Sequence, residues 1–135
     1  MADPVAAVTD THPLLFHARN AKRLPRVVAA HFAGCERGTA VTYVPVVVAW
    51  EVSLLVRVGK VHLGRSVAAF FDALFSNSAY QPLGLTMEQA CLADGARPND
   101  DPFDALIVAA AISLDLPLLT RDQDIQRSGL VNVIW

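Results

Sequence analysis

Four acidic residues could form one reactive site: Asp10, Glu51, Asp104 and Asp122. Carboxylates that lie close together repel one another, and each raises the pKa of the others unless a cation lies between them. Oxygen ligands select Mg²⁺ or Mn²⁺ over zinc, and no His or Cys pair at metal-binding spacing competes with them. Such a metal can activate water and neutralise charge on a leaving oxygen, so these residues indicate phosphate chemistry.

Two of these acids follow predicted strands. The segment 5–9 is short, apolar and tolerant of β-structure, and Asp10 directly follows it. A strand is also expected over residues 116–120, just before Asp122. The carboxyl ends of parallel strands meet at one edge of a sheet, where ligands collect, so we expect both acids there. Asp124, two residues further on, is expected to be a surface acid.

Asp104 belongs to a helix expected from Asp101 to about Asp115. Asp101 suits the N-cap and Pro102 the first helical position. The uninterrupted apolar run over 105–112 predicts a helix with all faces covered by protein. Carboxylates near a helix N-terminus are stabilising in their own right, so Asp101 is interpreted as a cap that could also be a metal ligand. Asp104 would then sit on a rigid, buried support.

Glu51 lies in a segment expected to be helical from Pro45 through Val58, although its three consecutive valines are poor helix formers. On a helix, Glu51 shares a face with Val47 and Leu54. A carboxylate on an apolar face is costly to bury unless something pairs with it. Glu51 therefore needs either a basic partner such as Arg57 or a metal.

The other expected elements alternate between strands and helices. Further helices are expected over 11–17, 24–37, 66–75, 86–94 and 122–127, and further strands over 40–44, 80–85 and 131–135. Pro82 places its strand at an edge of the sheet, and the segment 86–89 is typical of a capping box. The alternation predicts an α/β fold with a single domain over 1–135. Its parallel sheet should have about four to five short strands and helices on both faces.

The bulk composition fits this single domain. Hydrophobic residues make up 53% of the 135-residue chain, yet no apolar run approaches the roughly 20 residues that span a bilayer. The N-terminus lacks the basic region of a secretory signal, so we expect a soluble, cytoplasmic protein with no membrane contact. The net charge of −2 is unlike that of a protein that binds nucleic acid over its whole surface. Basic residues nevertheless form two local groups, over 19–26 and 57–65.

Other residues with chemical potential are interpreted as structural. Cys35 and Cys91 are expected to be buried thiols, not a bridge or a metal pair. Trp50 and Trp135 are expected to anchor the core. The remaining candidates are interpreted as structural or surface groups: His12, His17, His31 and His62.

Taken together, four short motifs resemble those of PIN-domain ribonucleases, and specifically of the VapC-like toxins of type II toxin–antitoxin systems. They occur in the family's order and span essentially the whole chain: Val8-Thr9-Asp10-Thr11-His12, Ala49-Trp50-Glu51-Val52 with Arg57-Val58-Gly59-Lys60, Asp101-Pro102-Phe103-Asp104, and Leu119-Thr120-Arg121-Asp122. Each motif is weak alone, and their combination is specific.

The resemblance implies a function. The four acids of this chain would hold one or two Mg²⁺ ions, with Mn²⁺ as a substitute, and Thr120 would support the site through its hydroxyl. The protein would then cleave RNA phosphodiester bonds, act as a homodimer and be neutralised by a cognate antitoxin. Two positions depart from the family pattern, because Ala105 stands where many relatives have Arg and Pro13 where an apolar residue is commoner. Neither removes a ligand.

Other functions remain compatible with the same motifs. A PIN nuclease can serve RNA processing or act on DNA without an antitoxin, and a non-catalytic PIN-like domain can be a binding module. The intact set of four acids argues against the last of these. A phosphatase of the haloacid dehalogenase type also begins with a strand-end Asp, but it requires a second Asp where this chain has His12.

Overall fold

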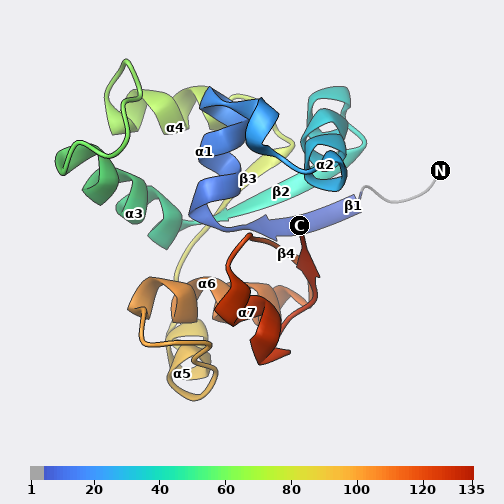
Figure 1. Ribbon diagram of the computed structural model, residues 1–135, viewed down its shortest axis with the longest axis vertical. Coiled ribbons are helices and arrows are strands. Elements are labelled where there is room, and N and C mark those ends of the chain that lie inside the picture. The colour runs from blue at the N-terminus through green and yellow to red at the C-terminus, as the bar shows by residue number, and fades with distance from the viewer. Residues whose placement is uncertain (1–4) are drawn as a thin grey trace.

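A computed structural model describes residues 5–135. Five parallel strands form one sheet in the order β3-β2-β1-β4-β5 (Figure 1). The strands are β1 (Val5–Thr9), β2 (Ala40–Pro45), β3 (Tyr80–Leu83), β4 (Leu118–Leu119) and β5 (Val133–Ile134). As the sequence predicted, the Pro82 strand lies at an edge of the sheet.

Helices cover both faces of this sheet, with α1 and α2 on one side and α5 and α6 on the other (Figure 1). The helices are α1 (Thr11–Arg19), the 3₁₀ helix η1 (Ala21–Arg23), α2 (Arg26–Arg37), α3 (Val46–Arg57), α4 (Val67–Phe75), α5 (Met87–Gly95), α6 (Pro102–Leu114) and α7 (Gln123–Ser128). The predicted α/β class is confirmed. No helix within residues 5–135 is long and apolar enough to cross a membrane.

The strand order creates a switch point beside β1. The chain builds outward from β1 through β2 to β3, and then returns to place β4 on the other side of β1. Thr9 is paired with Leu119, and the Asp10 amide donates a 2.9 Å hydrogen bond to the Leu119 carbonyl. The carboxyl ends of two neighbouring strands therefore open at a position where α/β folds collect ligands.

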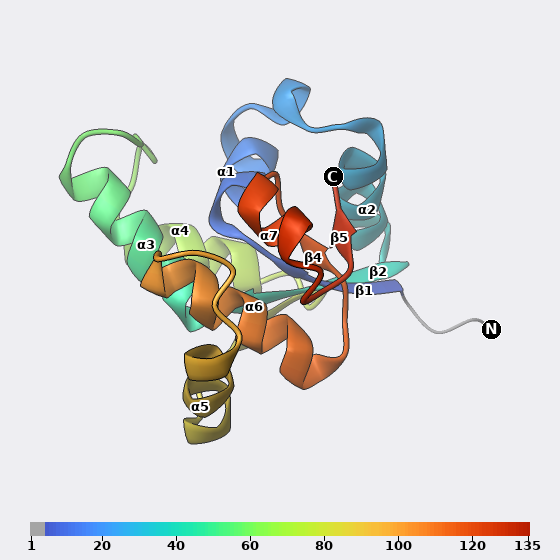
Figure 2. The same ribbon diagram turned by 60° about the horizontal axis from the view of Figure 1, so that its bottom comes forward.

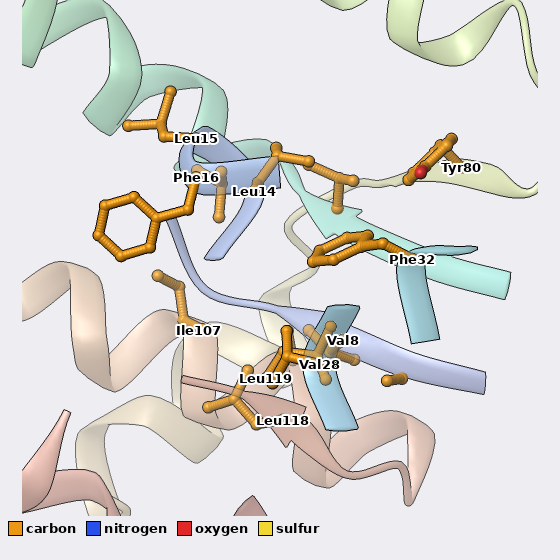
Figure 3. Close-up of a cluster of buried hydrophobic side chains, with 14 of the residues drawn as sticks. Val8, Leu14, Leu15, Phe16, Val28, Phe32, Tyr80, Ile107, Leu118 and Leu119 are labelled. Atoms are coloured by element: carbon orange, nitrogen blue, oxygen red, sulfur yellow. The ribbon is translucent and has the colours of Figure 1, made fainter. Parts of the chain in front are cut away.

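Helix α6 is enclosed, as its apolar run predicted. Ile107 and Val108 have no exposed surface and belong to the main core, where Figure 3 shows Ile107 near the β4 side chains Leu118 and Leu119. On another face of α6, Ala105 and Ala109 pack against α5, which lies on the outer side of α6 (Figure 2). Packing on both sides gives the start of α6 a rigid support.

Several element boundaries differ from the sequence-based expectation. Strands β4 and β5 keep only two residues each of the five expected. Pro117 has no N–H to donate and precedes β4, which limits that strand at its start. Helix α2 begins at Arg26, directly after Pro25, and η1 precedes it. The three valines of α3 are helical, because tertiary packing of Val47 and Val48 outweighs their weak propensity.

The expected capping box at the start of α5 is only half formed. Thr86 Oγ1 accepts a 3.1 Å hydrogen bond from the Gln89 amide, as predicted. The Gln89 side chain is buried against α6 and donates at 3.3 Å to Ser113 Oγ instead of returning to Thr86. A buried amide requires a partner in its own surroundings, and α6 supplies it.

The predictions for Trp50 and Cys91 are wrong. The Trp50 side chain is 58% exposed, because it lies two residues from the buried Val48 and Val52 and so falls on the opposite side of α3. Cys91 is exposed in the same way, two residues from the buried Ala93. Cys35, by contrast, is buried, and both cysteines are free thiols.

Trp135 and two of the histidines have structural contacts. The Trp135 ring lies against Phe16, with 6.5 Å between ring centroids. The His17 ring stacks on Phe32 at 4.4 Å, and His31 Nε2 shares a 2.9 Å hydrogen bond with Thr42. These contacts agree with the structural roles expected of Trp135, His17 and His31.

Candidate active site

Asp10 is held at the switch point between β1 and β4. Its Oδ1 accepts a 2.7 Å hydrogen bond from the Thr11 amide and caps α1, while its Oδ2 accepts a 2.6 Å hydrogen bond from Thr120 Oγ1. Burial raises the pKa of Asp10 from 3.8 to about 6 despite these hydrogen bonds. The negative charges of Glu51 and Asp122 raise this pKa further.

Asp104 occupies the first turn of α6, where its side chain is buried. Asn99 Nδ2 donates a 2.9 Å hydrogen bond to Asp104 Oδ2. Burial raises the pKa of Asp104 to about 6, the Asn99 hydrogen bond lowers it, and the charges of Asp10, Asp101 and Asp122 raise it. The sequence did not predict Asn99 as a site residue. Its position two residues before the N-cap Asp101 was the one signal that could have indicated it.

Glu51 points from α3 toward the end of β1. The Thr11 hydroxyl donates a hydrogen bond to Glu51 Oε1, and no ion pair between Glu51 and Arg57 forms within residues 5–135. Burial raises the pKa of Glu51, and the charges of Asp101 and Asp104 raise it further. The basic partner that the sequence allowed is thus replaced by a hydroxyl. Thr11 was not predicted as a site residue, although it directly follows the strand-end Asp.

Asp122 is positioned by the turn between β4 and α7. Its Oδ1 accepts a 3.0 Å hydrogen bond from the Ile125 amide and so caps α7. Its own amide donates at 3.1 Å to Thr120 Oγ1, the same hydroxyl that donates to Asp10. Thr120 therefore connects Asp10 to the backbone of Asp122.

Asp101 and Asp124 have contacts of their own. Asp101 Oδ1 accepts hydrogen bonds from the amides of Phe103 (2.8 Å) and Asp104 (3.4 Å), so Asp101 is the N-cap of α6, as predicted. Asp124 is an exposed acid whose carboxylate lies 3.4 Å from the Arg127 guanidinium. The surface interpretation of Asp124 is confirmed.

We call Asp10, Glu51, Asp104 and Asp122 the acidic cluster. Within residues 5–135, no Lys or Arg forms an ion pair with any of these four carboxylates. The atoms that could ligate a metal are all carboxylate oxygens, which fits a hard divalent cation. Within residues 5–135, however, no three His, Cys, Asp or Glu side chains are grouped closely enough to hold a metal ion. Metal coordination by the acidic cluster remains a prediction.

The model of the PIN domain family matches residues 7–129, which is nearly the whole chain. The chain therefore belongs to the PIN-domain family. No curated protein is a significant match in sequence.

Solved structures with the same fold include toxin–antitoxin complexes. VapBC2 from Rickettsia felis, bound to a DNA fragment from its promoter, is 13% identical with a TM-score of 0.69, covering 96% of this chain and 98% of that chain. DNA-bound VapBC from Salmonella typhimurium is 16% identical with a TM-score of 0.68, covering 96% and 97%. VapBC-5 from Mycobacterium tuberculosis is 20% identical with a TM-score of 0.60, covering 97% and 98%. At these identities the likeness shows a shared fold.

Proposed function

We propose that this protein is a VapC-like toxin: a metal-dependent endoribonuclease that hydrolyses RNA phosphodiester bonds and is neutralised by a cognate antitoxin. The observation that carries the proposal is that the acidic cluster, at the β1–β4 switch point, has no ion-pair partner within residues 5–135. Membership of the PIN-domain family and the fold shared with VapBC complexes support it.

In this proposal the acidic cluster holds Mg²⁺, or Mn²⁺ in its place, and Asp101 remains the cap of α6. The bound metal would activate water and neutralise charge on the leaving oxygen. The protein's own hydroxyl and amide groups orient the carboxylates: Thr120 fixes Asp10, Thr11 fixes Glu51 and Asn99 fixes Asp104. Because these partners are neutral, they leave the negative charge of the cluster intact.

Two protein partners belong to the same proposal. An antitoxin that places a basic side chain in the acidic cluster would supply the missing countercharge and occupy the cation's place. A homodimer would bring two such sites onto one assembly. Both partners are proposed from the family resemblance, and the VapBC complexes that share the fold support the antitoxin.

The proposal is tested by incubating the purified protein with total RNA, with and without Mg²⁺, and mapping the new RNA ends. We expect cleavage only with metal, and none from Asp104→Asn. Asp124→Asn removes the same charge from an exposed acid outside the cluster and should cleave like the wild type. Cleavage that survives excess chelator, or that Asp104→Asn retains, would reject the metal site.

A further inference from the structure

A cavity of about 350 Å³ with basic walls lies beside the acidic cluster. Its charged lining residues are Arg19, Arg23, Lys60 and Arg121, and no Asp or Glu among residues 5–135 lines it. Its volume falls in the range of about 300–1,000 Å³ that is typical of ligand pockets. We call it the basic cavity.

Two residues that line the basic cavity are close neighbours in sequence of members of the acidic cluster. His12 lines the cavity two residues after Asp10, and Arg121 lines it directly before Asp122. These residues extend from the ends of β1 and β4, which are neighbouring strands. Residues that adjoin two members of the acidic cluster therefore line the cavity.

Within the part of the chain that the structure describes, no acidic side chain pairs with the positive charges of the basic cavity. The ion pairs within residues 5–135 are Arg97–Asp94 and Arg127–Asp124, with a further His17–Glu36 contact that is an ion pair only when His17 is protonated, and none involves a cation of the cavity. The one hydrogen bond that restrains such a cation within the described chain is from Arg19 Nη1 to the Leu63 carbonyl, at 3.1 Å. The cavity thus presents several basic side chains whose charge is available to an anion.

Two of these guanidinium groups lie against the buried ring of Phe16. Arg23 Cζ lies 4.2 Å and Arg121 Cζ lies 5.1 Å from the ring centroid. Cation–π attraction to this ring stabilises and orients each guanidinium group. Two oriented guanidinium groups form several N–H donors that suit the oxygens of a phosphate.

We propose that the basic cavity binds a backbone phosphate of single-stranded RNA, on a nucleotide that flanks the bond held at the acidic cluster. The inference rests on the proposed RNA substrate, and it assigns to Arg23 and Arg121 the positioning of that substrate. A net negative protein can then bind a polyanion, because its positive charge is concentrated beside the reactive site.

The test measures RNA binding separately from cleavage. A fluorescently labelled single-stranded RNA is titrated with protein in excess chelator, where the metal-dependent reaction cannot proceed, and its anisotropy is recorded at several salt concentrations. We expect R23Q/R121Q to bind about tenfold more weakly or worse than the wild type. The slope of log K against log salt should fall by about 0.7 for each phosphate that the variant no longer neutralises.

The double variant R37Q/R97Q is the matched control, because it removes the same charge from two exposed arginines outside the basic cavity. It should keep the wild-type affinity and salt slope. K60Q removes a cavity charge without disturbing the contacts to Phe16 and should also weaken binding, which covers the case of a misfolded R23Q/R121Q. In cleavage assays with Mg²⁺, R23Q/R121Q should raise KM more than it lowers kcat.

If R23Q/R121Q and K60Q bind RNA with the same affinity as the wild type and R37Q/R97Q, the inference is overturned while the proposed nuclease activity stays in place. The wild type could also bind RNA without cleaving it, while only the cavity variants lose binding. That result would support the inference and reject the proposed function. If the cavity variants keep their RNA affinity but escape inhibition by the antitoxin, the basic cavity binds an acidic protein segment and not RNA.

Discussion

Thr120 Oγ1 donates a 2.6 Å hydrogen bond to Asp10 Oδ2, which joins two residues 110 positions apart in sequence. Both residues are buried, and the same hydroxyl accepts from the Asp122 amide. One side chain therefore fixes the strand-end carboxylate of β1 and the turn after β4. The arrangement of the candidate active site depends on this hydroxyl.

Thr120→Val should destabilise the protein and impair the site together. The change leaves Asp10 without one donor and the Asp122 amide without its acceptor, so we expect a loss of about 1–3 kcal/mol in the free energy of unfolding. Urea denaturation measures this loss, and RNA cleavage should fall in parallel. Thr120→Ser retains the hydroxyl and should restore most of both. A Val variant with wild-type stability and activity would contradict the role of this hydrogen bond.

The charge of Asp104 should make the metal-free protein less stable relative to Asp104→Asn as the pH rises. The pKa of Asp104 is about 6 in the folded protein and 3.8 without the fold, so the folded state binds more protons between these values. Stability from this group is therefore present below about pH 4 and is lost as the pH rises through about 6. The expected change is on the order of 1–3 kcal/mol.

This pH dependence is best measured as a difference between wild type and Asp104→Asn in chelator, by urea denaturation at pH 4.5 to 7.5 (roughly the window in which the group titrates). The difference removes the contributions of His17 and His31. The pKa of both histidines is lowered by burial, so their effect on stability has the opposite sign. A difference that does not vary with pH would show that Asp104 is not perturbed in this way.

Divalent metal should stabilise the protein through the acidic cluster. At neutral pH, Mg²⁺ at about 100 times its Kd should add about 2.7 kcal/mol to the free energy of unfolding. The reason is that a cation removes the repulsion from neighbouring acids that raises the pKa of Asp10, Glu51 and Asp104. Thermal unfolding with increasing Mg²⁺ measures the effect. Asp10→Asn should show much less of it, and an equal gain in that variant would place the metal elsewhere.

Trp50 and Ile107 should differ sharply in their contribution to stability. Trp50 is 58% exposed, so Trp50→Ala should change the free energy of unfolding by no more than about 0.5 kcal/mol. Ile107 is fully buried in α6, and Ile107→Ala should cost about 2–5 kcal/mol. Denaturant unfolding of both variants is the measurement. A large loss from Trp50→Ala alone would show that another surface covers this ring.

The local features of the acidic residues could be predicted from the sequence. An apolar strand that ends in Asp10 and a helix that opens with Asp101, Pro102 and Asp104 have signals within a few residues, because capping and strand burial depend on local chemistry. Alternating strands and helices were sufficient to predict a parallel sheet with helices on both faces. The four family motifs added the expected activity.

Tertiary structure alone decided how these residues meet. The placement of β4 beside β1 brings Thr120 to Asp10, and no local pattern fixes the order of strands in a sheet. The orientation of α3 against the core leaves Trp50 exposed and directs Glu51 toward Thr11. This orientation follows from packing against the rest of the chain. The basic cavity has the same origin. Its arginines come from separate segments, and only the fold places Arg23 and Arg121 near the ring of Phe16.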